Sequence, residues 1–185
     1  MRVQVVAPDS TWPASYIGEA MRLRDTLGSN VLEVHHIGST AILGIFAKPI
    51  IDILLVVQDL QLLDDSTPAL GKLGYEGLGE FGIPGRRYFR KNSPDGSRTH
   101  QIHSFLLGSV DAERHLAFRD YMNAHPAAAQ EYSSLKKSLA AAHPDAIDAY
   151  MDGKDCFIKA HELKALAWWR KVENSAQQSS EPTRP

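Results

Sequence analysis

A short turn between two predicted strands carries residue types that can bind phosphate. Residues 31–37 alternate between apolar and polar side chains and are rich in β-branched residues, a pattern that predicts a strand. A glycine and two hydroxyl residues follow, and they can bring backbone N–H groups and hydroxyl donors close to a bulky anion. The predicted phosphate-binding residues of this turn are Gly38, Ser39 and Thr40.

A lone aspartate in the next apolar run could face a metal ion. Asp52 interrupts residues 50–57 (IIDILLVV), a pattern typical of a strand that is buried on both faces. Because an unpaired buried carboxylate is costly, Asp52 either holds a divalent cation or has a structural partner, such as a buried arginine or a capped loop. A phosphate-binding turn beside a carboxylate-held metal is what phosphoryl and nucleotidyl transfer require, so the functional interpretation makes Asp52 catalytic.

Histidines and lysines elsewhere in the chain could complete such a site. His103 lies in a predicted strand and could reach Asp52 as a catalytic or metal-binding group, although a structural hydrogen bond explains it equally well. His100 is a further candidate metal ligand. The candidate phosphate-binding lysines are Lys48, Lys136 and Lys154. The last two each follow a tyrosine by four residues, so each pair shares a helix face, and the alternative is a solvated lysine lying over apolar surface.

The elements that must position these residues form a mixed core followed by helices. We expect an α/β (α+β) fold, with a small mixed sheet flanked by helices and a C-terminal helical section. A single domain should span residues 1–173, with the mixed core in 1–108, the helical section in 109–173 and a disordered tail in 174–185. The predicted helices cover residues 12–27, 60–73 (broken near Pro68), 111–124, 126–142 and 145–172, and further strands cover 86–92 and 99–107.

Composition argues against several classes of protein, among them disulfide-bonded, nucleic-acid-binding and membrane proteins. The chain has 185 residues and a formal net charge of −2, so it is long enough for one domain with a proper core and gives no strong nucleic-acid signal. The lone cysteine, Cys156, excludes an internal disulfide and a cysteine-based zinc site, and favours a reducing, cytoplasmic location. The apolar runs are of strand length, so we expect no membrane association.

The segment from residue 36 to 54 (HIGSTAILGIFAKPIIDIL) closely resembles the GrpB family of small bacterial and fungal proteins, in the polymerase-beta-like nucleotidyltransferase superfamily. The likeness continues in HQIH at 100–103, in FRDY at 118–121 and in two Tyr-x-x-x-Lys patterns that end at Lys136 and Lys154. It covers nearly everything from Trp12 to Trp168. The resemblance implies the superfamily fold, with the Gly-Ser turn on nucleotide phosphates, and it implies no particular substrate.

The sequence departs from the metal motif of an active superfamily enzyme. Such enzymes carry Asp-x-Asp and a third acid on a later strand, whereas the second position here is Leu54 and residues 99–107 contain no acid. Leucine cannot ligate Mg²⁺, and a single aspartate with histidines would suit Mn²⁺ or Zn²⁺ better, or no metal.

Two main functions therefore stay open. The first is transfer of a nucleotidyl group from a nucleoside triphosphate to an unknown acceptor, with Mg²⁺ or Mn²⁺ as the cofactor. The second is a catalytically reduced protein that binds a nucleotide or another phosphorylated small molecule, as a sensor or with a protein partner. Metal-assisted hydrolysis centred on Asp52, His100 and His103 is a weaker third interpretation.

Overall fold

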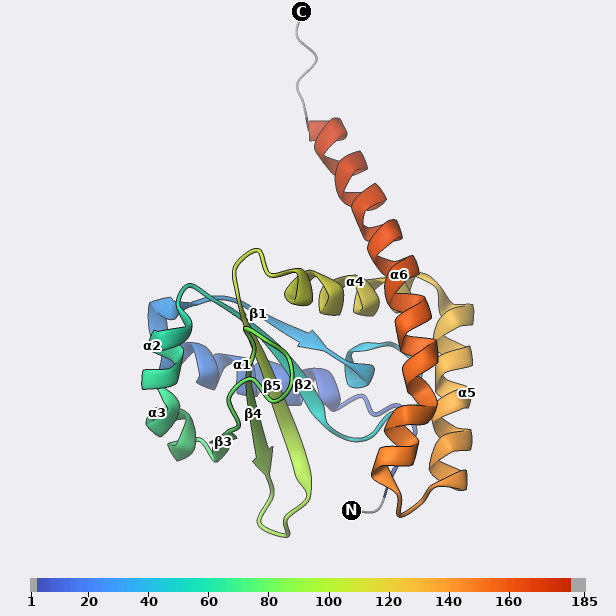
Figure 1. The fold of residues 1–185 in the computed structure, drawn as a ribbon, viewed down its shortest axis with the longest axis horizontal. Coiled ribbons are helices and arrows are strands. Elements are labelled where there is room, and N and C mark those ends of the chain that lie inside the picture. Colours follow the sequence, from blue (N-terminus) through green and yellow to red (C-terminus); the bar gives the residue numbers. More distant parts are fainter. Residues whose placement is uncertain (1–2, 181–185) are drawn as a thin grey trace, which may run out of the picture.

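The structure, a computed structural model, describes residues 3–180, and its elements lie close to those that the sequence predicts (Figure 1). The strands are β1 (Val31–Ile37), β2 (Ile51–Val57), β3 (Tyr75–Gly77), β4 (Arg87–Asn92) and β5 (Arg98–Leu106). The α-helices are α1 (Trp12–Leu27), α2 (Leu60–Asp65), α3 (Thr67–Lys72), α4 (Val110–Ala124), α5 (Pro126–Ala142) and α6 (Ile147–Ser180). Two 3-10 turns, η1 (Gly28–Asn30) and η2 (Ser39–Ala41), precede and follow β1.

The strands of the described residues form a mixed sheet in the order β1-β2-β5-β4-β3. β2 pairs with β1 in the antiparallel sense and with β5 in the parallel sense, and β4 and β3 continue the sheet as antiparallel strands. A parallel neighbour requires a long crossover connection, and residues 58–97 supply it. The predicted fold class, a small mixed sheet flanked by helices, is confirmed.

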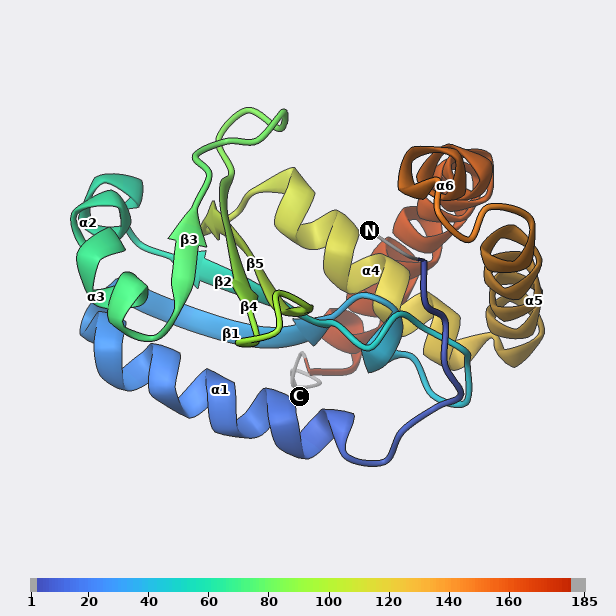
Figure 2. The same ribbon diagram turned by 90° about the horizontal axis from the view of Figure 1, so that it is seen from below.

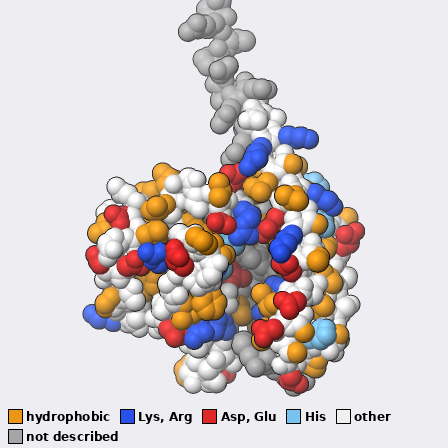
Figure 3. All heavy atoms as spheres, in the orientation of Figure 1, with side chains coloured by type: hydrophobic (Ala, Val, Ile, Leu, Met, Phe, Trp, Pro, Cys, Tyr) orange, Lys and Arg blue, Asp and Glu red, His pale blue; other side chains and the backbone are white. Residues whose placement is uncertain are grey.

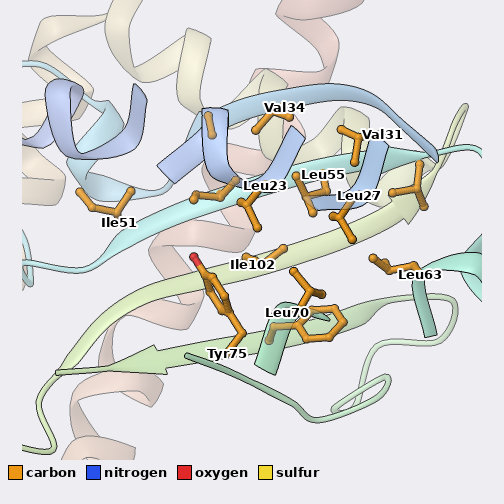
Figure 4. Close-up of a cluster of buried hydrophobic side chains, with 14 of the residues drawn as sticks. Leu23, Leu27, Val31, Val34, Ile51, Leu55, Leu63, Leu70, Tyr75 and Ile102 are labelled. Atoms are coloured by element: carbon orange, nitrogen blue, oxygen red, sulfur yellow. The ribbon is translucent and has the colours of Figure 1, made fainter. Parts of the chain in front are cut away.

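Strand β2 is covered on both faces, as its apolar run predicts. Ile51, Ile53 and Leu55 belong to a buried cluster that includes Leu23 and Leu27 of α1 (Figure 4). Successive side chains of a strand point to opposite faces, so Leu54 lies on the other face, in a second cluster with residues of β1, β5 and α4. Figure 2 shows the same two layers, with α1 along one face of the sheet and α4 against the other.

The helical section fixes the loop that follows β1. Ile42 and Ile45 of this loop lie in a third buried cluster with Met122 of α4 and Tyr132 of α5. The loop backbone is also tied to the helices, because Phe46 N donates to the Ser133 hydroxyl at 2.9 Å. The predicted phosphate-binding turn is therefore held between the sheet and the C-terminal helices, although the two are far apart in the sequence.

The differences from the predicted elements are small and local. The predicted break near Pro68 is present, since α2 ends at Asp65 and α3 begins at Thr67. β3 was not predicted, because three residues are too short for a recognisable period. Helix α6 continues through residues 174–180, which were predicted to be disordered; proline and glycine are absent from residues 173–180, so no helix breaker interrupts it. Residues 181–185 lie outside the described residues.

A buried carboxylate joins α1 to strand β4. The Glu19 side chain is 0% exposed, and its Oε1 accepts from Lys91 Nζ at 2.9 Å while its Oε2 accepts from Arg22 Nε at 3.0 Å. Burial alone would raise the pKa of Glu19, but the hydrogen bonds from Lys91 and Arg22 outweigh it and hold this pKa below its usual value. The cost of burying the carboxylate is thus offset by two cations from different elements.

We expect Glu19→Ala to lower the free energy of unfolding by about 3 kcal/mol, because it leaves Lys91 beside an empty, desolvated position. Urea denaturation at pH 7 measures this change. The matched control is Glu33→Ala, since the Glu33 side chain is 46% exposed, and it should change stability by less than about 0.5 kcal/mol. Equal urea midpoints for Glu19→Ala and the wild type would contradict the assigned role.

Candidate functional site

A cleft of about 390 Å³ opens on the sheet face that carries Asp52, between the sheet and the N-terminal half of α6. Figure 3 shows a hollow between the part of the surface formed by the sheet and the part formed by α5 and α6, with charged side chains along its rim. The polar and charged residues that line the cleft are Ser39, Lys48, Asp52, Arg86, Tyr88, Gln101, His103, Tyr150 and Lys154. A larger hollow of about 590 Å³ beside α5 has Lys137 as its charged lining residue, so we place the candidate site in the first cleft.

The backbone of Gly38 lies directly against the Asp52 carboxylate. Ile37 and Asp52 are paired across β1 and β2, and Gly38 has a φ of 69° in the left-handed region that favours glycine. A Cβ atom at Gly38 would lie 2.2 Å from Asp52 Oδ2, which is far inside van der Waals contact. Glycine is therefore required here so that the carboxylate can approach the turn.

The two hydroxyl residues of the turn have different environments. Ser39 lines the cleft near Tyr132; burial raises the pKa of the Tyr132 hydroxyl, and Ser39 acts in the opposite direction. Thr40 is buried; its Oγ1 donates to Ile50 O at 3.1 Å and lies 2.9 Å from His36 Nε2. Because the hydroxyl proton of Thr40 is used in this bond, its side chain fastens the turn to the start of β2. Of the two hydroxyl residues, Ser39 lines the cleft and Thr40 does not, and the phosphate role of each stays a prediction.

His103 lies beside Asp52, as predicted. Its Nε2 is 4.0 Å from Asp52 Oδ1, and Arg86 Nη1 lies 3.4 Å from its Nδ1. A guanidinium can only donate, so Nδ1 is the acceptor and the ring proton is on Nε2, facing the carboxylate. Burial, with the charges of Arg86 and Arg114, lowers the pKa of His103 to about 3, so the ring is neutral at physiological pH.

Asp52 combines burial with basic neighbours. Burial raises the pKa of its carboxyl to about 6, and the opposing attraction of Lys154 and Lys48 limits the shift. The side chain is 24% exposed, so it can be reached from the cleft. At pH 7 it is ionised, with cations as its charged neighbours.

The predicted metal ligands do not come together. His100 pairs with Ile51 in the sheet, so it points to the face covered by α1, away from Asp52. Leu54 is fully buried among apolar side chains at the position of the second carboxylate. Within residues 3–180, no group of three or more His, Cys, Asp or Glu side chains could hold a metal ion. The residues present therefore do not fit a two-metal site, which needs several oxygen ligands.

Two of the three predicted phosphate-binding lysines line the cleft. Lys48 and Lys154 line it, with their Nζ atoms 5.4 Å and 5.6 Å from the centre of the Tyr150 ring. Burial lowers the pKa of both, that of Lys154 to about 8. The charge of Lys48 lowers the pKa of Lys154 further, the charge of Arg98 lowers that of Lys48, and Asp52 raises the pKa of both lysines.

Lys136 is different, because it is 1% exposed and is not among the residues that line the cleft. Its Nζ is 4.3 Å from the centre of the Tyr132 ring and has no hydrogen-bond partner within the described part of the chain. Burial and the charge of Lys154 lower its pKa to about 7.

Several lining residues were not recognised as site residues from the sequence. Tyr88 is paired with His103 across β4 and β5, and Gln101 is paired with Asp52, so sheet register brings them to the cleft. Phe81 comes from the glycine-rich segment that connects β3 to β4. No local spacing signals these positions, since each depends on a strand pairing or loop path that joins distant residues.

None of the helices in residues 3–180 is both long enough and apolar enough to cross a membrane.

Comparison with known proteins agrees with the resemblance of residues 36–54. The chain is 42% identical to UPF0157 protein YqkA of Bacillus subtilis over 96% of its own length, but it spans about half (51%) of YqkA. It is 35% identical to the glutamate-rich protein GrpB of Alkalihalophilus pseudofirmus, with 84% of this chain and 91% of that protein covered. The crystal structure of the conserved protein GrpB from Enterococcus faecalis is 44% identical and superposes with a TM-score of 0.85, covering 90% of this chain and 99% of the other. The sequence model of the family described as GrpB protein matches residues 2–164, so this chain belongs to the GrpB family.

Proposed function

We propose that this protein binds a phosphorylated small molecule, such as a nucleoside triphosphate, in the cleft beside Asp52. The observation that carries the proposal is an excess of positive charge. The charged side chains among the described lining residues are Lys48, Arg86 and Lys154 against the single carboxylate of Asp52, and the buried Lys136 is near enough to Lys154 for its pKa to be lowered by that charge. An anion is the ligand that this arrangement favours.

The free energy of the charged lysines explains why an anion would bind. A lowered pKa means that the charged form of a lysine is destabilised, here by burial and by a neighbouring charge, that of Lys48 for Lys154 and that of Lys154 for Lys136. A bound phosphate would supply the missing negative charge and would raise both pKa values again. The Ser39 hydroxyl lines the same cleft and adds a donor. Phosphates would therefore lie between the Gly38–Ser39 turn and α6.

A second candidate is transfer of a nucleotidyl group from the triphosphate to an acceptor. Its support is the ionised Asp52 carboxylate held against the turn by Gly38. This candidate requires a divalent cation, for which the chain supplies one carboxylate and a His103 whose Nε2 bears a proton. We rank ligand binding first for that reason.

Affinity for inorganic tripolyphosphate should fall as the pH rises. With a pKa of about 8, the Lys154 side chain is about nine-tenths protonated at pH 7 and about one-tenth protonated at pH 9, so affinity should drop by up to about tenfold. Isothermal titration calorimetry in EDTA measures the change. Lys154→Met should weaken binding at pH 7 and flatten the pH profile.

The matched control is Lys159→Met, because Lys159 lies on the same helix with its side chain 71% exposed. It should bind like the wild type. If Lys154→Met also binds tripolyphosphate like the wild type at both pH values, the proposed phosphate position is wrong.

Lys136→Met should stabilise the free protein while weakening anion binding. The folded pKa of Lys136 is about 7 and the unfolded value is about 10.5. Between these values the unfolded chain binds more protons than the folded chain, so wild-type stability gains from rising pH. The variant lacks this contribution, and its advantage in melting temperature should be larger at pH 7 than at pH 9.

Lys137→Met is the control for this test, because Lys137 is the exposed neighbour on α5. Thermal unfolding at both pH values provides the measurement. A Lys136→Met protein that melts below the wild type at pH 7 would show that the ammonium has a stabilising partner, and the argument from unbalanced charge would fail.

Asp52→Asn separates the two candidate functions. The carboxyl pKa is about 6, so at pH 7.5 the substitution removes a negative charge from the cleft. Tripolyphosphate in EDTA should bind several-fold more tightly, because a repulsion of roughly 1 kcal/mol is lost. Asp148→Asn, an exposed change on α6, should have no effect.

The transferase candidate predicts that Asp52→Asn weakens binding of ATP in the presence of Mg²⁺. If Asp52 holds a cation, Mg²⁺ should tighten ATP binding to the wild type but not to Asp52→Asn. Equal effects of Mg²⁺ on both proteins would exclude Asp52 as a cation ligand and leave the binding function.

A further inference from the structure

Phe81 is an exposed aromatic residue at the edge of the cleft. Its side chain is 60% exposed, and its backbone φ of 44° is positive, which within residues 3–180 is otherwise found at glycines. Bulky residues rarely adopt this conformation, and strained residues persist where the surrounding structure fixes them, often at ligand sites. The Phe81 side chain belongs to none of the three buried hydrophobic clusters, so packing of the core does not explain its conformation.

Arg86 fixes the segment that carries Phe81. Its Nη2 donates to Phe81 O at 2.6 Å and its Nε donates to Glu80 O at 3.1 Å. Glu80 in turn accepts from Gly85 N at 2.6 Å, which closes the segment on itself. The Phe81 ring is therefore presented on an anchored loop, and Arg86 also contacts His103 in the cleft.

One face of the Phe81 ring is stacked on Tyr88. The ring centres are 5.0 Å apart with an interplanar angle of 15°, and the Tyr88 ring meets His103 edge-on at 5.3 Å. Tyr88 is 6% exposed, so the ring that supports Phe81 is buried. The aromatic series runs from His103, beside Asp52, to the exposed Phe81. A flat aromatic surface thus lies in the same cleft as the lysines.

We propose that Phe81 is a stacking platform for a nucleobase, an inference that rests on the proposed binding of phosphates in this cleft. A nucleotide has a planar, apolar end and an anionic end, and the cleft offers an aromatic face and a basic wall for these two parts. Stacking on an aromatic ring tolerates any base, because every base has a π-face. The ligand class is therefore a nucleoside phosphate rather than a simple phosphate or a sugar phosphate.

The test compares ATP and inorganic tripolyphosphate on the wild type and two variants by isothermal titration calorimetry. Phe81→Leu keeps an apolar side chain without an aromatic face, and Phe81→Trp keeps the face. Phe81→Leu should weaken ATP binding by about 5- to 100-fold and change tripolyphosphate binding by less than about twofold, as expected for loss of base stacking. Phe81→Trp should bind ATP like the wild type. Leu43→Ala, at a position that is 80% exposed, controls for loss of an exposed apolar side chain.

The outcomes separate this inference from the proposed function. If tripolyphosphate binds and Phe81→Leu leaves ATP affinity unchanged, or weakens both ligands equally, the platform is overturned and the phosphate site stands. If the wild type does not bind tripolyphosphate, the proposed function fails, and adenosine at millimolar concentration then tests the platform alone. Binding of adenosine that Phe81→Leu abolishes would support the platform, and absent or unchanged binding would overturn it.

Discussion

The contact between the Gly38 backbone and the Asp52 carboxylate sets the geometry on which the candidate site depends. It exists because the end of β1 is paired with the start of β2 and because a residue without a Cβ occupies the turn. The loop after Gly38 then has to pass between the sheet and α4, α5 and α6, where Ile42 and Ile45 are buried. Close approach at one backbone position therefore places the turn, the carboxylate and the helical section around a common cleft.

The electrostatics of this cleft are the opposite of those in a two-metal site. Where a second carboxylate would face the metals, Leu54 is packed with Ile37 and Phe105 beneath α4. The cleft is lined by the cations Lys48 and Lys154, and Lys136 is buried outside its lining. Burial lowers the pKa of Lys136 and of Lys154, and the charge of a neighbouring lysine lowers each pKa further.

Much of the fold was predictable, because local patterns control it. Prolines at positions 68 and 126 break or begin helices through their own stereochemistry. The apolar run of β2 predicted burial on both faces, and both faces are covered. Of the predicted site residues, Ser39, Lys48, Asp52, His103 and Lys154 line one cleft, whereas Thr40 and Lys136 are buried outside its lining and His100 points to the opposite face.

The sequence by itself determined which residues could do chemistry and on which elements they lie, since helical and strand periods, turn glycines and helix breakers act over a few positions. Tertiary structure alone decided which of those residues meet. The parallel pairing of β2 with β5 placed His103, and not His100, on the Asp52 face, because a side chain's face changes with every residue of register. Lys136 of α5 is buried only in the folded chain. The path of the segment before β4 brought Phe81 to the cleft. These outcomes depend on contacts between residues far apart in the chain, which no local pattern records.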